Sequence, residues 1–118
     1  MTTRYDYTFQ AGDTEHILLA YLDASSTPID LTGVTARVQL RAVKTDEIET
    51  LEVLGVIDIP TAELAFTFSA EETEALIPIG ELRARYYYDV EVTYPNSDVE
   101  TLITGVITVI LGVSRNRR

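Results

Sequence analysis

The side chains best suited to chemistry are a single histidine, His16, and nineteen carboxylates. A Ser-His-Asp triad needs a histidine held beside a nucleophile. His16 instead stands in an alternating apolar stretch next to Glu15, and the chain contains no nucleophile motif. We therefore predict an ordinary strand position for His16, no catalytic residue, and a protein that is not an enzyme.

The many carboxylates raise the question of a paired acid and base, as in glycoside hydrolysis. Most of them fall at polar positions of alternating segments or at the start of a predicted helix, where solvation and mutual repulsion explain them. A glycan hydrolase fragment is the least favoured function. The chain has no EF-hand spacing, P-loop, HExxH motif or cysteine, so we predict no cofactor and no metal site.

Three consecutive tyrosines, Tyr86, Tyr87 and Tyr88, suggest a different chemistry, because aromatic rings stack on sugars and bases. Tyrosine is also a favoured strand residue. Strand alternation sends Tyr86 and Tyr88 inward together and leaves Tyr87 outside. A carbohydrate-binding module that uses Tyr87 and outward acids is therefore kept as an alternative function of another class.

Charge is distributed unevenly along the chain. The net charge is −10, yet three of the nine basic residues lie in the last four positions. Residues 1–114 hold six basic and nineteen acidic residues, a net charge of −13, and such a body repels nucleic acid and anionic membranes. The start of the chain has no signal-peptide pattern. The longest apolar stretch, LITGVITVILGV, is too short and too rich in Thr and Gly to span a bilayer. We expect synthesis in the cytoplasm, and neither nucleic acid nor membrane as a partner.

Period-two alternation of apolar residues dominates the rest of the chain and predicts half-buried strands. The predicted strand segments are 5–9, 14–23, 34–43, 51–60 with an interruption at Gly55, 62–68, 85–94 and 99–113. Ser69 and Glu72 have capping-box spacing and predict one short helix near residues 69–77. The fold expected is an all-β antiparallel β-sandwich, Ig-like or jelly-roll-like, of about seven or eight strands. It forms one domain over residues 1–114, followed by a basic tail at 115–118.

The stretch TPIDLTG before the 34–43 strand is explained by turn chemistry. The Asp30 carboxylate can accept hydrogen bonds from N–H groups just downstream. Gly33 can adopt a positive φ and begin the next strand. No ligand is needed to account for either residue.

The last predicted strand, 99–113, is longer than the expected diameter of a compact globule of this chain length. It would extend about 50 Å, whereas a globule of this chain length is about 35 Å across. Either Gly105 bends or bulges it, or its end leaves the body. It is apolar on both faces, so cover from a second subunit is an alternative to burial within its own sandwich. The predicted partner-binding residues are Val109, Ile110, Leu111, Val113, Arg115, Arg117 and Arg118, with Thr2, Thr3 and Arg4 as weaker candidates.

Four stretches, YDYTFQAGDT, PIDLTGVTARVQLR, LAFTFSAEET and RYYYDVEVTYPNSDVETLITGVITVILGVSR, follow one another in an order that resembles a family. The chain is similar, over residues 5–114, to small structural proteins of tailed bacteriophages and to the amino-terminal domain of siphophage baseplate upper proteins. The resemblance implies a β-sandwich building block of the virion. In baseplate upper proteins this domain docks a receptor-binding apparatus onto the tail.

The function expected from this resemblance is that of a non-enzymatic virion structural protein. It would be a small adaptor in the tail, baseplate or neck that docks neighbouring subunits or fibres. Its partners would be other virion proteins and copies of itself in a symmetric assembly. Exposed edge strands and terminal segments would make the contacts. A capsid decoration protein is the alternative within the same class.

Overall fold

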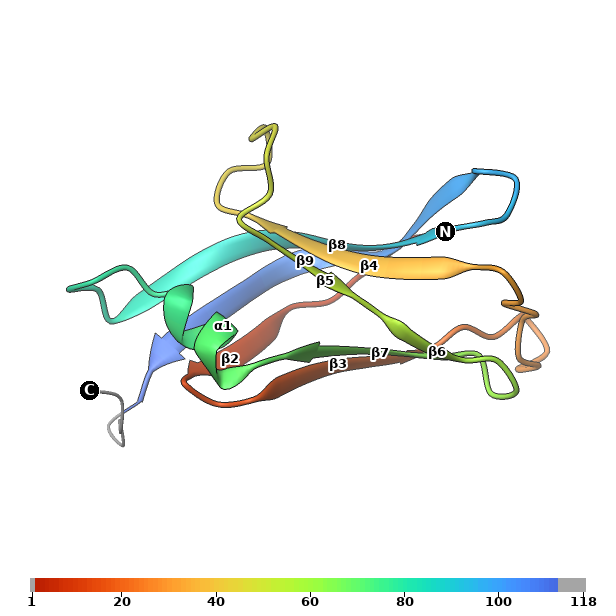
Figure 1. Ribbon diagram of the computed structural model, residues 1–118, viewed down its shortest axis with the longest axis horizontal. Helices are drawn as coiled ribbons and strands as arrows, with labels where there is room; N and C mark the ends of the chain where they lie inside the picture. The colour runs from red at the N-terminus through yellow and green to blue at the C-terminus, as the bar shows by residue number, and fades with distance from the viewer. Residues whose placement is uncertain (1, 113–118) are drawn as a thin grey trace.

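The computed structural model describes residues 2–112 and consists of two facing β-sheets with one short helix (Figure 1). The all-β sandwich prediction is confirmed. The elements are β1 (Thr3–Arg4), β2 (Tyr7–Ala11), β3 (Glu15–Ala20), β4 (Thr35–Arg41), β5 (Leu51–Leu54), β6 (Val56–Asp58), β7 (Glu63–Phe68), α1 (Ala70–Ala75), β8 (Arg83–Thr93) and β9 (Val99–Leu111).

The larger sheet has the order β1-β9-β8-β4-β5, with β2 also paired to β9. The β8–β9 and β8–β4 pairs are antiparallel, as expected from the alternation. However, β1 and β2 run parallel to β9, which makes this sheet mixed. The turn after β2 carries the chain into the other sheet, so the N-terminal strands can add to the free edge of β9 without forming a hairpin with it.

The smaller sheet has the order β3-β7-β6 and is antiparallel. Strands β5 and β6 are two halves of one extended segment that passes from the larger to the smaller sheet at Gly55. A Cβ atom at this position would lie 2.9 Å from the Phe66 ring. The predicted interruption at Gly55 is thus the point where the chain crosses over the core.

The core between the sheets is built by the inward positions of the strands. Along β8, Tyr86, Tyr88, Val90 and Val92 are buried, as the alternation predicts. Between the sheets, the rings of Phe9 and Phe68 meet edge to face, with centroids 5.0 Å apart. The remaining fully buried side chains that pack with them include Ile17, Leu31, Val38, Leu40, Leu64, Phe66 and Ile107.

The long final strand fits because the molecule is elongated, with extents of 46 × 29 × 21 Å. The 13 residues of β9 span about 43 Å and run along the long axis (Figure 1). A bend or bulge at Gly105 was one of the alternatives for this strand, but the bulge of β9 lies at Leu102, the extra residue between Thr101 and Ile103, which oppose Glu91 and Val90. Gly105 instead permits a close backbone approach, since a Cβ there would lie 2.0 Å from the Tyr5 carbonyl oxygen.

Two local predictions are confirmed at the ends of the sandwich. Ser69 and Glu72 form the reciprocal capping box of α1. Asp30 Oδ1 accepts hydrogen bonds from the Thr32 N–H and hydroxyl, at 3.0 and 2.7 Å, and Gly33 has a φ of 78°. Both features stabilise local structure, the first the start of α1 and the second the turn before β4. Neither needs a ligand to explain it.

Candidate functional site

The two sheets are not closed on one side of the molecule. Strand β3 pairs with β7 on one edge, and its other edge has no strand partner among residues 2–112. Strands β1 and β2 pair with β9 and are likewise unpaired on their far side. In Figure 1 the N-terminal chain and β3 diverge beyond the β2–β3 turn. We call the space between them the open seam.

Two adjoining hollows, each of about 450 Å³, lie along the open seam. Both are lined by Thr3, Leu18, Leu19 and Ile103. One extends toward Tyr21, Leu22 and Leu102, and the other toward Tyr5, Tyr7 and His16. The lining is apolar apart from hydroxyls, backbone and the His16 imidazole, and it contains no Asp, Glu, Lys or Arg, so it differs from the acidic remainder of the surface.

Leu18 is the most conspicuous side chain of the open seam, because it is apolar and 69% exposed. It lies in register with Ala65 of β7, which in turn faces Val56 of β6, 73% exposed. An apolar row therefore crosses the outer face of the smaller sheet and ends at the free edge of β3. Edge strands usually carry charges or proline that prevent pairing. From His16 to Ala20, β3 has no Asp, Glu, Lys, Arg or Pro, so this part of its edge is open to a partner strand.

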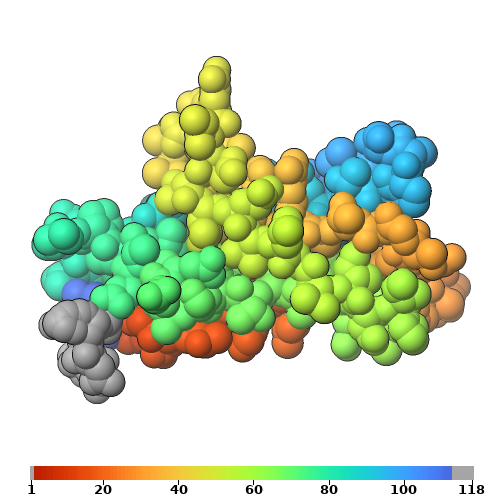
Figure 2. Space-filling model, viewed as in Figure 1, coloured from red at the N-terminus to blue at the C-terminus, as the bar shows by residue number. Residues whose placement is uncertain are grey.

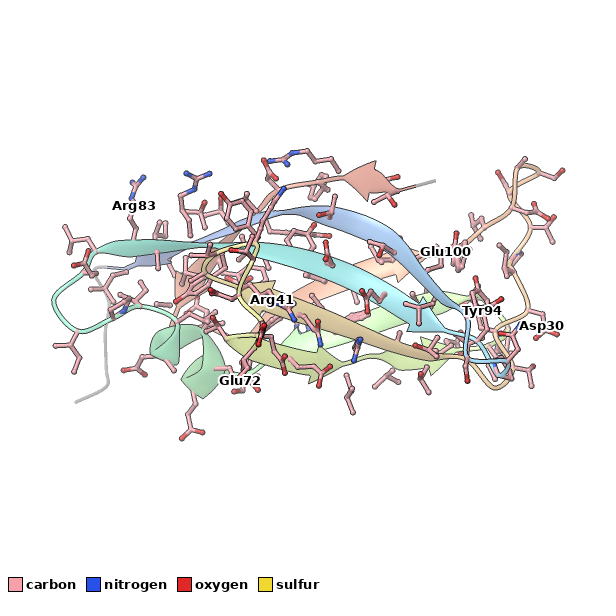
Figure 3. All side chains as sticks on the ribbon, turned by 90° about the horizontal axis from the view of Figure 1, so that it is seen from above. Asp30, Arg41, Glu72, Arg83, Tyr94 and Glu100 are labelled. Atoms are coloured by element: carbon pink, nitrogen blue, oxygen red, sulfur yellow. The ribbon has the colours of Figure 1, made fainter. Side chains whose placement is uncertain are left out.

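A hydrogen-bonded group closes one end of the open seam. The Tyr21 and Tyr94 hydroxyls both donate to Glu100 Oε1 at 2.9 Å, and their oxygens are 3.1 Å apart. Figure 3 shows Tyr94 and Glu100 near the same end of the molecule. The hydrogen bonds from Tyr94 and Tyr21 lower the pKa of Glu100, while burial is the main reason that the pKa of Tyr94 is raised. The group is a structural anchor for the β8–β9 turn.

Buried tyrosines should make the protein sensitive to alkali. Burial raises the pKa of Tyr88, which is 2% exposed and donates to the Tyr5 carbonyl oxygen at 2.6 Å. Because the folded pKa lies above the unfolded value of about 10, stability is complete below that pH and falls as pH rises. We expect Tyr88 alone to cost about 1.4 kcal/mol per pH unit above about pH 10.

Urea unfolding at a series of pH values from 8 to 11.5 measures this effect. The variant Tyr88→Phe should be less stable at pH 8, since it loses the hydrogen bond to Tyr5, yet its stability should fall less steeply above pH 10. An equal slope for wild type and variant would contradict the assignment.

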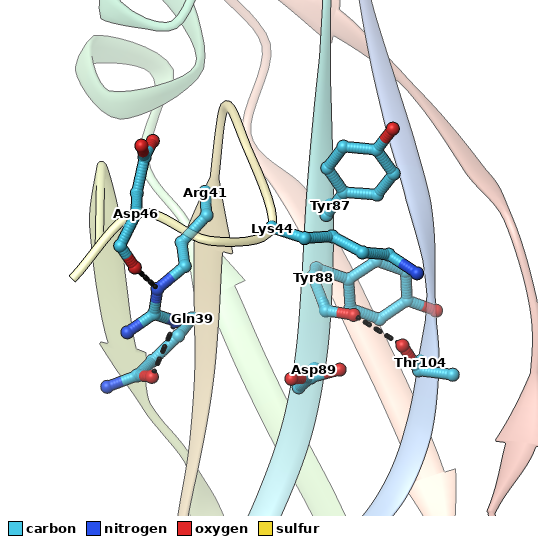
Figure 4. Close-up of a pocket in the computed structure, with 8 residues that line it drawn as sticks. All are labelled: Gln39, Arg41, Lys44, Asp46, Tyr87, Tyr88, Asp89 and Thr104. Carbon is cyan, nitrogen blue, oxygen red and sulfur yellow. Dashed lines mark hydrogen bonds between the residues drawn. The ribbon is translucent and has the colours of Figure 1, made fainter. Parts of the chain in front are cut away.

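A second hollow, which we call the polar pocket, lies on the outer face of the larger sheet (Figure 4). Its base is formed by β4, β8 and β9, and its wall by the loop at residues 42–50, which projects from the body in Figure 2. Its volume is about 450 Å³. The residues that line it are Gln39, Arg41, Lys44, Asp46, Tyr87, Tyr88, Asp89 and Thr104.

The partner-binding residues predicted from the sequence lie in different environments. Val109 is wrong as a contact residue, because it is 0% exposed and lies in the core between the sheets. Ile110 and Leu111 are half-buried. Thr3 lines the open seam, whereas Arg4 pairs with Asp6 at 3.2 Å. The other predicted contacts are Thr2, which is exposed and donates to the Thr101 carbonyl, and Val113, Arg115, Arg117 and Arg118, which lie outside the described residues.

Sequence reasoning missed Leu18 and Val56, although a signal was present. In the segment around β3, His16, Leu18 and Ala20 share the outward phase, and a leucine at an outward position is the exception to hydrophobic-in and polar-out alternation. His16 itself occupies the expected ordinary strand position, with Nδ1 3.1 Å from the Thr67 hydroxyl on the neighbouring strand.

Two further searches of residues 2–112 were negative. No group of three or more His, Asp or Glu side chains is placed to hold a metal ion. No helix in this range is long and apolar enough to cross a membrane.

No family model matches the chain, and no curated protein is significantly similar to it.

Proposed function

We propose that this protein is a non-enzymatic structural component of a tailed-bacteriophage virion, which docks neighbouring subunits across the open seam. The segments that carry the resemblance to phage structural proteins are β4 with its entry turn and the β8–β9 hairpin, which form the centre of the larger sheet. The observation that carries the docking role is the free edge of β3, with Leu18 exposed on it.

The partner at the open seam is a second copy of this chain. Each copy has a net charge of −10, so two copies repel over most of their surfaces. The lining of the open seam is uncharged, which makes it the region where two copies can approach with least repulsion. Contacts that obey a twofold axis use the same patch on both partners.

A twofold axis through Leu18 satisfies strand geometry. Residues directly opposite each other in an antiparallel pair share a face, so Leu18 meets Leu18 of the second copy. His16 then lies opposite Ala20, and Ile17 opposite Leu19, with no like charges facing. Two three-stranded sheets would join into one continuous sheet, and the exposed leucines would be buried against each other.

The same surface suits an adaptor in the tail, baseplate or neck and a decoration protein on the capsid. We favour the adaptor because the resemblance is to a baseplate domain. Locating the protein in the tail or on the capsid of the particle distinguishes these two functions.

Particle incorporation tests this function. Particles are assembled with the wild-type protein or with Leu18→Lys, purified, and analysed by quantitative mass spectrometry. We expect wild-type protein at a fixed copy number per particle and at least a tenfold lower amount of the variant. A wild-type protein absent from purified particles, or a variant incorporated to the same level, would refute the proposal.

A further inference from the structure

We propose that the polar pocket binds a neutral saccharide. This inference goes beyond the docking function and is independent of it, because it uses the outer face of the larger sheet and not the open seam. It is carried by Asp89 and Lys44, which the fold brings into one pocket without an ion pair, and by the exposed ring of Tyr87 beside them.

The first observation is an acid and a base that share the polar pocket without pairing. Asp89 is half-buried in the middle of β8, and its carboxylate makes no hydrogen bond or ion pair with residues 2–112. The Lys44 ammonium lies 5.2 Å from the centroid of the Tyr87 ring. It also forms no ion pair with any residue in the range 2–112. The next outward-facing pair on the same strands does form an ion pair, because Arg37 and Glu91 lie 3.0 Å apart.

The second observation is that the wall of the polar pocket is held in place. Arg41 donates from Nε to the Asp46 carbonyl at 2.9 Å and from Nη1 to Gln39 Oε1 at 3.0 Å (Figure 4). The Asp46 carboxylate accepts from the Val43 N–H at 3.2 Å. These bonds fix the start of the 42–50 loop against β4, so the site exists before a ligand arrives.

The ligand class follows from the charges and from the ring. Arg41 and Lys44 balance Asp46 and Asp89, so the polar pocket has no net charge to attract an anion or a cation. Sugar hydroxyls both donate and accept, so they can donate to the Asp89 carboxylate and accept from the Lys44 ammonium. Tyr87 is 39% exposed and offers an aromatic edge and face to the C–H groups of a sugar ring. The volume of about 450 Å³ is within the usual range for small-molecule sites.

The test is a titration with neutral mono- and disaccharides of hexoses, N-acetylhexosamines and 6-deoxyhexoses, followed by saturation-transfer NMR and calorimetry. We expect saturable binding of at least one sugar. Asp89→Asn, which keeps the side-chain shape, and Tyr87→Ala should each weaken it at least tenfold. Glu71→Gln, at an exposed acid of α1, is the matched control and should leave binding unchanged.

Circular dichroism of each variant separates loss of the site from loss of the fold. The proposal is overturned if no sugar of the panel binds saturably. It is also overturned if folded Asp89→Asn and Tyr87→Ala bind as well as the wild type. None of these results affects the docking function, because the open seam and the polar pocket have no lining residue in common.

Discussion

Replacing Gly105 with alanine is expected to destabilise the fold by about 3 kcal/mol or more. The added Cβ would lie 2.0 Å from the Tyr5 carbonyl oxygen, which is backbone and cannot rotate away. The same carbonyl accepts the hydrogen bond of the buried Tyr88 hydroxyl. Close by, Asp6 Oδ1 accepts from the Val106 N–H at 2.9 Å. The alanine would therefore push the N-terminal chain off β9 and break several hydrogen bonds together.

Urea unfolding of wild type and Gly105→Ala measures this difference. Gly80→Ala is the control, because it adds the same Cβ atom at a site where nothing lies within 4 Å of it. Gly80 has a φ of 89°, so its replacement reports backbone strain alone. Backbone strain alone should cost about 1 kcal/mol there. If Gly105→Ala were no more destabilising than Gly80→Ala, the close approach of Tyr5 to β9 would be wrong.

Replacing Leu18 with lysine is expected to abolish self-association while the fold is retained. In the twofold arrangement two lysines would face each other at the centre of the contact. Buried like charges without partners are strongly unfavourable, so we expect the dissociation constant to rise at least a hundredfold, or about 2.7 kcal/mol. In the single copy Leu18 is already mostly exposed, so the change should alter the free energy of unfolding by less than about 0.5 kcal/mol.

Sedimentation equilibrium over a range of protein concentrations checks this result. Ile79→Lys provides a matched control, because Ile79 is fully exposed in the loop between α1 and β8 and does not line the open seam. It makes the same change in charge and hydrophobicity. Equal association of both variants, or no association of the wild type at any concentration, would contradict docking through β3.

Local patterns in the sequence predicted much of the fold. Alternation placed Tyr86, Tyr88, Val90 and Val92 inward because burial of one strand face depends on near neighbours in the chain. The α1 cap was predicted for the same reason, since Ser69 and Glu72 bond each other's backbone within one helical turn.

Features that depend on distant parts of the chain could not be predicted in this way. The parallel direction of β2 on β9 follows from where the chain changes sheets, and alternation is the same for either direction. The bulge lies at Leu102, and Gly105, which was one candidate for it, instead accommodates the backbone of Tyr5 from the far end of the chain.

The candidate sites show the same limit. Tyr87 was predicted to face outward, but the position of Lys44 over its ring was not predicted. Leu18 carried a weak signal as an apolar residue in a polar phase, but only the sheet order shows that it lies at an unpaired edge. Val109 was named as a contact residue because a strand that is apolar on both faces does not reveal which face its own core covers.

Electron cryomicroscopy of the particle that contains the protein tests the central claim most directly. The account predicts density for a strand of a second copy alongside β3, antiparallel to it, with Leu18 buried at the contact. A reconstruction in which the edge of β3 and the side chain of Leu18 face solvent, while the protein is held through other surfaces, would contradict it.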